Sequence, residues 1–330
     1  GARSSGMTPE MVDMGFFGSS SALPPYQPHS KDEDPAITAR VDALMFSWMT
    51  TSEFPKVTEH AVEIERVVEN RPDLSSIEDK DLVQRMRDMM PLFAKIFSTH
   101  SEVSAAASVT MGAITGLALG LGKPGLDLRI AGGLGGVASA EPSIAMWDIS
   151  RIVRDSSSLT AAFEKGTENI FDNIEAVGDD AFDTAFEALL NNYGSRGHNE
   201  WELRSRTWQT HPELALIMID RMRLASEKQD PRLRHEQARR RSSEALAKLR
   251  GLVAEDQISA GTLEIAVTSS SVFIPAREAA KTTIVKVVHE VRLAALELGR
   301  RLASDGRLNS PEHVFMLQDQ DLEAAIAGGM

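Results

Sequence analysis

From residue 34 onward, apolar residues recur every three or four positions, and runs that alternate apolar and polar residues are nearly absent. Such spacing keeps apolar side chains on one face of an α-helix, whereas a half-buried strand needs a period of two. We therefore expect a mainly α fold, with one large multi-helix domain over residues 34–330. Residues 1–33 are dense in Gly, Ser and Pro, so we expect an irregular lead-in or linker there.

Prolines and glycines mark the expected helix boundaries. Three long helices are expected to begin at prolines, over residues 212–227, 231–254 and 275–303. Pro91 should kink or interrupt the helix that contains it. Residues 120–142 hold seven glycines and form the clearest expected loop. A phosphate cradle is the alternative interpretation of this stretch, although the spacing of the known phosphate-binding motifs is missing.

Charge and cysteine content exclude several classes of site. The chain carries 35 basic and 48 acidic residues, a formal net charge of −13. This acid excess argues against nucleic-acid binding, which needs a basic surface. The absence of cysteine excludes disulfides, thiolate metal sites and a cysteine nucleophile, and it fits a reducing compartment. Because neither an HExxH nor a DxDxDG spacing occurs, we predict no metal site in this chain.

A basic run extends over residues 231–250. Such a run is typical of a solvated helix face. Contact with a nucleotide-bearing or acidic partner domain is the alternative.

Residues 103–122 are apolar and about long enough to cross a membrane. They are rich in Ala, Gly, Ser and Thr, however, and no aromatic belt flanks them. We therefore favour a buried helix against which its neighbours pack closely. The first residues also lack the basic start and apolar run of a secretory signal. These features predict a cytoplasmic protein that binds no membrane, and a membrane-associated protein built on this segment is the alternative.

Two glycines stand among alternating charges in the segment YGSRGHNEWELRSRTW, residues 193–208. The glycines predict a tight turn, and the charged side chains around it should pair with each other or with a ligand. An ion-pair network that holds a long connection is one interpretation. The other is the polar wall of a binding site that includes Arg196, His198 and Glu200, with the arginines facing an anionic group.

A second cationic feature lies in the segment PAREAAKTTIVKVVHEVR, residues 275–292. Arg277 and Lys281 are four residues apart, about 6 Å along a helix, and Arg292 lies within about 20° of the same direction. The three cations would form a stripe on one face of the helix. A solvated stripe is one interpretation, and a site for a phosphoryl group, whose charge is spread over several oxygens, is the other.

Three pieces of the sequence occur in an order that carries a family resemblance. They are GLGGVASAEPSIAMWDISRIVRDSSSL, then YGSRGHNEWELRSRTW with the following HPEL, then the AREAAK helix with GRLNSPEHVFML. Together they resemble the central helical domain of rifampicin phosphotransferases, in the phosphoenolpyruvate-synthase and pyruvate phosphate dikinase group. The resemblance covers roughly residues 30–320, and the last two motifs are the more specific when they occur together.

The resemblance implies a function that this chain shares with other domains. In that family an ATP-grasp domain phosphorylates a histidine on a swivelling domain, and this histidine delivers the phosphoryl group to a substrate held by the helical domain. The expected partners are a hydroxyl-bearing small-molecule acceptor, such as an ansamycin antibiotic, and ATP-grasp and phosphohistidine domains in cis or in trans. ATP and Mg²⁺ are expected in the complete enzyme, and no cofactor in this chain.

Only the helical part is found in this sequence. We expect either an excised domain or a stand-alone relative, which should bind the acceptor without phosphorylating it. A role in antibiotic resistance would follow from an antibiotic acceptor. The alternative from another class is a non-catalytic helical protein that serves as a small-molecule sensor or scaffold.

The resemblance also implies roles for particular residues. The family's Arg-x-x-x-Lys matches Arg277 and Lys281, which would be the catalytic residues that steady the phosphoryl group near the acceptor hydroxyl. The family's Tyr-Gly-x-Arg-Gly-x-x-Glu piece matches this sequence at Tyr193, Gly194, Arg196, Gly197 and Glu200. These residues would form the floor of the site, with His198 and Arg292 as further substrate-binding candidates.

The apolar pocket for the acceptor has no position-by-position match. Methionine and aromatic side chains suit a large, irregular ligand, and plain core packing is the alternative role for each of them. The candidates are Met45, Trp48, Met89, Met90, Phe93 and Met111, with His100 as a polar group of the same pocket.

Overall fold

The computed structural model describes residues 35–135, 140–166 and 169–328. These residues form α-helices and short 3-10 segments, and within these ranges no strand occurs, which confirms the mainly α fold. The irregular lead-in predicted for residues 1–33 lies outside the described part of the chain. Contacts between Cα atoms divide the chain into two compact units, which are described separately below. The prediction of one acceptor-binding domain over residues 34–330 stays a prediction.

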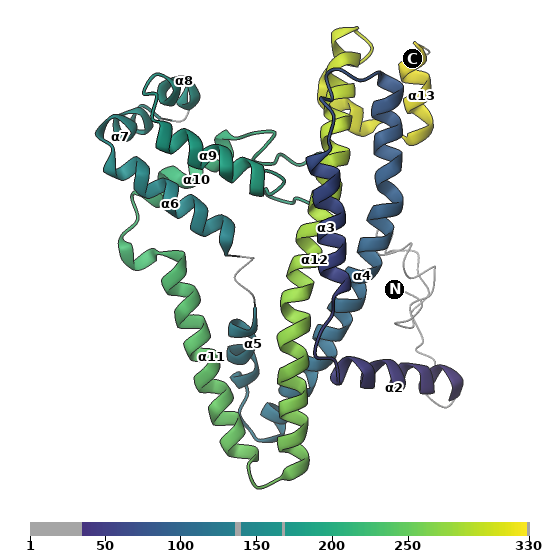
Figure 1. Cartoon of the computed structure of the whole chain (residues 1–330), viewed down its shortest axis with the longest axis vertical. Coiled ribbons are helices and arrows are strands. Elements are labelled where there is room, and N and C mark those ends of the chain that lie inside the picture. Colours follow the sequence, from purple (N-terminus) through teal and green to yellow (C-terminus); the bar gives the residue numbers. More distant parts are fainter. Residues whose placement is uncertain (1–34, 136–139, 167–168, 329–330) are drawn as a thin grey trace. The chain divides into compact units, whose positions relative to one another are not determined.

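In chain order the elements shown in Figure 1 are α2 (Pro35–Met49), α3 (Lys56–Glu69), α4 (Asp79–Gly120), α5 (Leu126–Leu134), α6 (Glu141–Asp155), α7 (Ser157–Glu164), α8 (Ile170–Glu175), α9 (Asp180–Tyr193), α10 (Glu213–Arg223), η3 (Glu227–Gln229), α11 (Pro231–Val253), α12 (Gln257–Ser304), η4 (Pro311–Met316) and α13 (Asp319–Ala327).

Within the described ranges, unit 1 comprises residues 35–59, 95–135 and 238–280. One of its cores joins α5 and α11 to the parts of α4 and α12 that belong to this unit, through residues such as Ile114 and Leu249. Another core joins α2 to α4 and α12 and includes Trp48 and Phe273. Large apolar side chains on facing helices therefore supply most of the stabilising burial in this unit.

The glycine-rich stretch 120–142, predicted as a loop, contains the helix α5, so that prediction was wrong in part. Leu126 and Ile130 are spaced by one turn and are buried in the core shared with α11. The glycine at position 133 allows a close helix approach, because a Cβ there would lie 2.2 Å from the Cβ of Ser242 on α11. The Ser242 hydroxyl donates a hydrogen bond to the Ile130 carbonyl at 2.7 Å. Helix packing thus explains Gly133 without a phosphate.

Both long helices pass through a proline. The sequence predicts a kink or interruption at Pro91 and a helix start at Pro275, but α4 continues through the first and α12 begins well before the second. Each proline removes one N–H donor from the helix, which costs about 3 kcal/mol. Buried residues on the neighbouring turns, such as Phe273 and Ala280 around Pro275, offset this cost and keep the helix intact.

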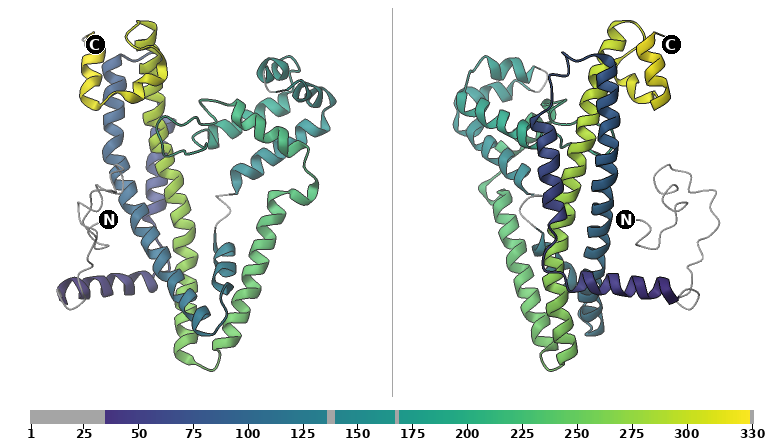
Figure 2. Two further views of the ribbon diagram at one scale, coloured as in Figure 1. Left: turned by 180° about the vertical axis from the view of Figure 1, so that it is seen from behind. Right: turned by 45° about the vertical axis from the view of Figure 1, so that its right-hand side comes forward.

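Within the described ranges, unit 2 comprises residues 60–94, 140–166, 169–237 and 281–328. Helices α6 to α10 gather around one core, in which Phe182 and Leu216 are buried (Figure 1). A second core joins the first part of α4 to the last part of α12, η4 and α13, and it includes Leu82 and Leu298. Two views in Figure 2 show α3 running alongside α12, where Lys286 of α12 pairs with Glu65 of α3.

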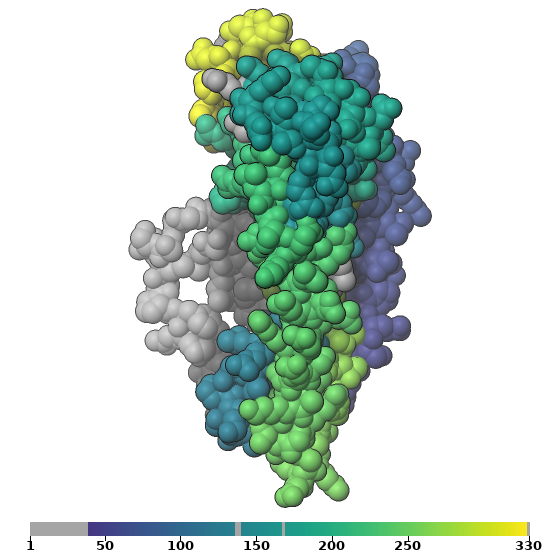
Figure 3. Space-filling model, turned by 90° about the vertical axis from the view of Figure 1, so that its left-hand side faces the viewer, coloured from purple at the N-terminus to yellow at the C-terminus, as the bar shows by residue number. Residues whose placement is uncertain are grey.

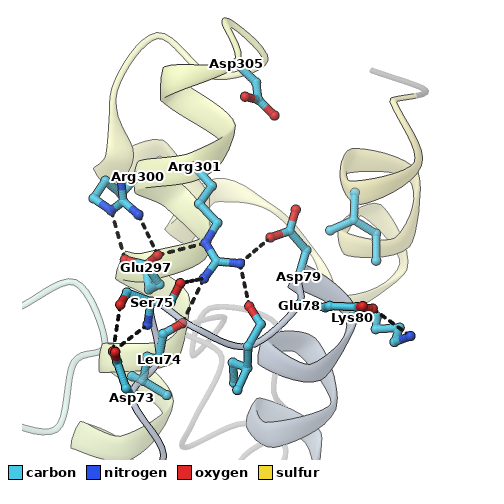
Figure 4. Close-up of polar contacts among 12 residues, drawn as sticks. Asp73, Leu74, Ser75, Glu78, Asp79, Lys80, Glu297, Arg300, Arg301 and Asp305 are labelled. Atoms are coloured by element: carbon cyan, nitrogen blue, oxygen red, sulfur yellow. Dashed lines mark hydrogen bonds and ion pairs between the residues drawn. The ribbon is translucent and has the colours of Figure 1, made fainter.

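Arg301 of α12 holds the loop that precedes α4 in place (Figure 4). Its guanidinium donates hydrogen bonds of 2.7 to 3.0 Å to three backbone carbonyls and two carboxylates, those of Leu74, Ser75, Ile77, Asp79 and Glu297. A guanidinium has five N–H donors, and all five of them are used here. The loop is therefore fixed mainly through its backbone.

By length and composition alone, α4 and α12 are each long and apolar enough to cross a membrane. The core helix of a soluble protein passes the same test. The predicted helix from residue 103 onward is confirmed, and one face of it, with Val103, Ala106, Thr110 and Ile114, is buried. The cytoplasmic location stays a prediction.

Candidate functional site

Glu200 joins two of the cations that the sequence singled out. Its carboxylate lies 3.3 Å from Nζ of Lys281 and 3.3 Å from Nε of Arg196. The Glu200 side chain is 9% exposed, whereas those of Lys281 and Arg196 are 36% and 21% exposed. One nearly buried carboxylate thus faces two cations that solvent can reach. The structure brings these three predicted site residues together in unit 2.

Two glycines shape the turn that carries Glu200. A Cβ on Gly194 would lie 2.3 Å from the carbonyl oxygen of Leu190, and one on Gly197 would lie 2.4 Å from that of Arg206. No larger residue fits either position without moving the backbone. The N–H of Gly197 donates a hydrogen bond of 3.4 Å to Glu200. The predicted tight turn is therefore present, and it orients the carboxylate.

Arg292 does not complete the expected cationic stripe. Its side chain is almost fully buried, and it donates hydrogen bonds of 2.9 to 3.0 Å to the carbonyls of Glu200, Glu202 and Leu203. Burial lowers the pKa of Arg292 to about 10, so the guanidinium keeps its charge at neutral pH. Because its donors bind the backbone of the loop, Arg292 belongs to the wall of the site, and its role as a substrate-binding residue stays a prediction.

His289 lies behind Arg292 and is also buried. Its Nδ1 lies 3.1 Å from Nη1 of Arg292 and its Nε2 lies 2.8 Å from Oε1 of Gln209. A guanidinium can only donate, so Nδ1 must accept and Nε2 must carry the proton that goes to Gln209. Burial, together with the charges of Arg292 and Arg71, lowers the pKa of His289 to about 3. The imidazole is therefore neutral at physiological pH.

A polar cavity of 270 Å³ lies beside His289, and the sequence analysis missed it. Glu290 lines it and is held by Arg71 at 3.0 Å and by Arg85 at 2.5 Å. The available signal was the pair His289–Glu290, which stands between valines in the run KVVHEV. Charged residues inside an apolar helix run indicate partners contributed by other segments.

An apolar cavity of 620 Å³ lies in the same unit. Met86, Met90 and Phe315 contribute to its wall, and Glu202 and Leu203 extend it from the loop that follows Glu200. Met90 was among the predicted pocket residues. Its neighbour Met89 is not on this wall and is buried. Phe315 was missed, because its segment carries no clear helical or strand period.

The remaining pocket candidates are divided between the two units. Met45, Trp48, His100 and Met111 belong to unit 1, whereas Met89 and Phe93 belong to unit 2. Trp48 and Met111 pack in different clusters of unit 1.

Met45 and His100 are the other two candidates in unit 1. Met45 is 39% exposed. The ring of His100 lies 6.4 Å from that of Phe97. Met111 packs against its core cluster, whereas the buried indole Nε1 of Trp48 has no hydrogen-bond partner among the described residues. Their role in ligand binding stays a prediction.

Two further candidates are exposed. The Arg277 side chain is 54% exposed and lies 3.7 Å from the carboxylate of Glu278, the next residue along α12. His198 is exposed on the turn of unit 2. Among the described residues, no group of three or more His, Asp or Glu side chains could hold a metal ion.

The comparisons with known proteins identify the family. The family model for the rifampicin phosphotransferase fourth domain matches residues 99–278, which is more than half of the chain. The matched range includes Arg196, Glu200 and Arg277 and ends just before Lys281. No curated protein matches the chain. The extent of the family match and the helical fold together show that this chain belongs to the family of the rifampicin phosphotransferase fourth domain.

Proposed function

We propose that this chain is the acceptor-binding domain of a dikinase-type phosphotransferase. It would hold a hydroxyl-bearing small molecule while a phosphohistidine domain, in cis or in trans, delivers the phosphoryl group. The observation that carries the proposal is the contact of Glu200 with both Lys281 and Arg196. Membership of the rifampicin phosphotransferase fourth-domain family supports the phosphotransferase class.

The charges around Glu200 suit the reversible binding of an anion. Lys281 and Arg196 share one carboxylate, so the cluster sets two basic side chains against one acidic side chain. A phosphoryl group, with its charge spread over several oxygens, can take the place of Glu200 at the ammonium of Lys281. Glu200 would then keep its contact with Arg196. Lys281 would thereby neutralise charge that develops during the transfer.

Arg277 stands one helical turn before Lys281 on α12, with a side chain open to solvent. Arg277 belongs to unit 1, and the family resemblance supports its role in steadying the incoming phosphoryl group. Its only carboxylate neighbour at ion-pair distance among the described residues is Glu278, at 3.7 Å. This weak, exposed contact leaves the guanidinium available to an anion.

The apolar cavity of 620 Å³ is the proposed place for the body of the acceptor. Its volume lies within the range of about 300–1,000 Å³ that is usual for small-molecule sites. The loop that carries Glu200 also supplies Glu202 and Leu203 to the cavity wall. A large, mostly apolar molecule with hydroxyl groups, such as an ansamycin, fits this lining, in which Met86 and Met90 can adapt to irregular shapes.

The proposed step transfers a phosphoryl group from nitrogen to oxygen. The P–N bond of the phosphohistidine breaks, a P–O bond to the acceptor forms, and the hydroxyl proton ends on the released imidazole. ATP and Mg²⁺ would serve the ATP-grasp domain that regenerates the phosphohistidine. This chain would supply the binding surface and the cations.

The test joins the chain to ATP-grasp and phosphohistidine domains of the family and measures both acceptor binding and phosphorylation. Candidate acceptors are first found by thermal-shift screening of ansamycins and phenols, and transfer is read as the mass of the phosphorylated product. We expect Lys281→Ala to lower the transfer rate at least a hundredfold and to leave the acceptor Kd unchanged. Lys286→Ala, on the same helix and paired with Glu65, is the matched control and should keep most of the rate.

Equal losses of binding and transfer in Lys281→Ala would contradict the assigned role. Tight binding of an acceptor without transfer in the joined protein would favour a small-molecule sensor instead.

A further inference from the structure

A third cavity in unit 2 is lined by other residues than the two cavities described above. It has a volume of 570 Å³ and lies where α6, α10 and the first turns of α11 meet. The segment after α10, with Ala225 and Gln229, contributes to its edge. Neither Glu200 nor Lys281 is among its lining residues, so the inference below does not rest on the proposed function.

The floor of this cavity is apolar and includes an aromatic ring. Trp147, Met218, Met222 and Pro231 contribute to it. The guanidinium carbon of Arg151 lies 3.9 Å from the centroid of the Trp147 ring, which holds the indole in place. Trp147 is only 3% exposed, so the accessible apolar surface comes mainly from the two thioethers beside it, and such a surface suits a flat aromatic body.

The rim of the cavity is cationic. Arg221 and Arg234 both line it, His235 stands beside them, and no Asp or Glu is among the lining residues. Arg221 and Arg234 are both exposed. This local charge contrasts with residues 141–200, where 12 acidic and four basic residues give a net charge of −8.

In the described part of the chain, the arginines that line the cavity have no ion-pair partner, whereas two arginines close to it are paired with carboxylates. Arg151 pairs with Glu227 at 2.9 Å, and Arg232 pairs with Asp148 at 2.6 Å. Within the described ranges, Arg221 and Arg234 have no carboxylate at ion-pair distance. Arg151 and Arg232 are thus neutralised by carboxylates, whereas Arg221 and Arg234 on the rim can bind an anion.

We propose that this cavity binds an anionic aromatic small molecule, whose ring lies on the floor around Trp147 and whose phosphate, sulfonate or carboxylate lies between Arg221 and Arg234. Two guanidinium groups can bind such an anion with several charge-assisted hydrogen bonds. The volume is large enough for a two-ring system with its charged group. Recognition should need both parts of the ligand, because the floor offers few polar groups and the rim little apolar surface.

Three probes separate these two contributions. 1-Naphthyl phosphate carries ring and charge, 1-naphthol carries the ring alone, and inorganic phosphate carries the charge alone. Binding is measured by equilibrium dialysis on the whole chain, and the methyl signals of Met218 and Met222 are followed by NMR. We expect 1-naphthyl phosphate to bind at one site at least tenfold more tightly than either other probe and to shift both methyl signals.

Matched variants test the rim and the floor. The double variant Arg221→Ala with Arg234→Ala should weaken 1-naphthyl phosphate at least tenfold and leave 1-naphthol unchanged. Arg232→Ala, which removes an arginine of the same segment that faces Asp148, should bind all three probes as the parent chain does. Met218→Glu places a carboxylate on the floor and should abolish binding of the phosphate ester. Because both arginines are exposed, circular dichroism should show the parent fold in the double variant.

Three outcomes would overturn the proposal. In the first, the double variant keeps the affinity of the parent chain for 1-naphthyl phosphate. In the second, inorganic phosphate alone binds as tightly as the ester. In the third, the ester binds without moving the Met218 and Met222 signals.

Discussion

Replacing Arg292 by methionine should release the loop that carries Glu200. Arg292 donates to the carbonyls of Glu200, Glu202 and Leu203 from a side chain that is almost fully buried. Hydrogen bonds to a charged group contribute about 1.5–3 kcal/mol each. The variant no longer has to bury the guanidinium charge, and this gain offsets part of the sum. The methionine side chain fills most of the space that the arginine side chain leaves. We therefore expect a loss of about 3–5 kcal/mol in the free energy of unfolding, because three carbonyls lose their buried donor.

The assay combines urea unfolding with amide hydrogen exchange of residues 200–204. Arg292→Lys should lose nearly as much stability as Arg292→Met, because one ammonium cannot reach three carbonyls. Arg300→Met is the control, since Arg300 is 59% exposed and pairs only with Glu297 of its own helix among the described residues, which predicts a loss below about 1 kcal/mol. A loss below about 1 kcal/mol for Arg292→Met, or unchanged exchange in the loop, would refute this account.

Three further predictions follow from contacts elsewhere in the chain. Arg301→Lys should lower the free energy of unfolding by about 2–4 kcal/mol in urea, because lysine has three donors on one nitrogen where five are used. Arg300→Lys, its exposed neighbour, should lose little. His289 has a folded-state pKa of about 3, below its ordinary value of 6.5, so the unfolded chain takes up its proton first as the pH falls. Stability should therefore decline from pH 6.5 downward by up to about 1.4 kcal/mol per pH unit on account of this group. His289→Gln, which can keep both hydrogen bonds, should flatten that decline between pH 7 and 5 in chemical unfolding curves, and an unchanged slope would refute the buried neutral state. Gly133→Ala should cost about 1–3 kcal/mol through its clash with Ser242, and Ser242→Gly should restore part of the loss in a double-mutant cycle.

Helical type was predictable from sequence, but helix ends were less so. The period of apolar residues predicted the mainly α fold, and α11 agrees with its predicted span to within one residue. The start of α12 was misplaced, because a proline that suits a first helical turn is also tolerated inside a helix whose flanks are buried. In α5, the glycines suggested a loop because the sequence does not show which neighbour they allow to come close.

The site was predictable in part. Arg196, Glu200 and Lys281 were all singled out, and the structure brings them together. Arg292 was placed correctly on its helix by the period of rotation, but its burial depends on a loop about 90 residues earlier in the chain. Contacts between distant segments of this kind leave little trace in a single sequence. The apolar cavity likewise combines segments from four parts of the chain, and Met90 is the one lining residue that was a predicted pocket candidate.

The same limit applies to the basic run of α11. The structure leaves Arg239, Arg240 and Arg241 exposed on that helix, whose surface is visible along the face shown in Figure 3. The sequence could not show that Arg232 pairs with Asp148 while Arg234 lines a cavity.

Two arginines of α12 bind loops chiefly through backbone oxygens, Arg292 at residues 200–203 and Arg301 at residues 74–77. Every amino acid offers the same carbonyl group, so substitutions on these loops leave the anchoring bonds in place. The side chains at 202 and 203, which line the apolar cavity, are therefore free to diversify. Through such positions, relatives could evolve new molecular preferences while retaining one inherited scaffold.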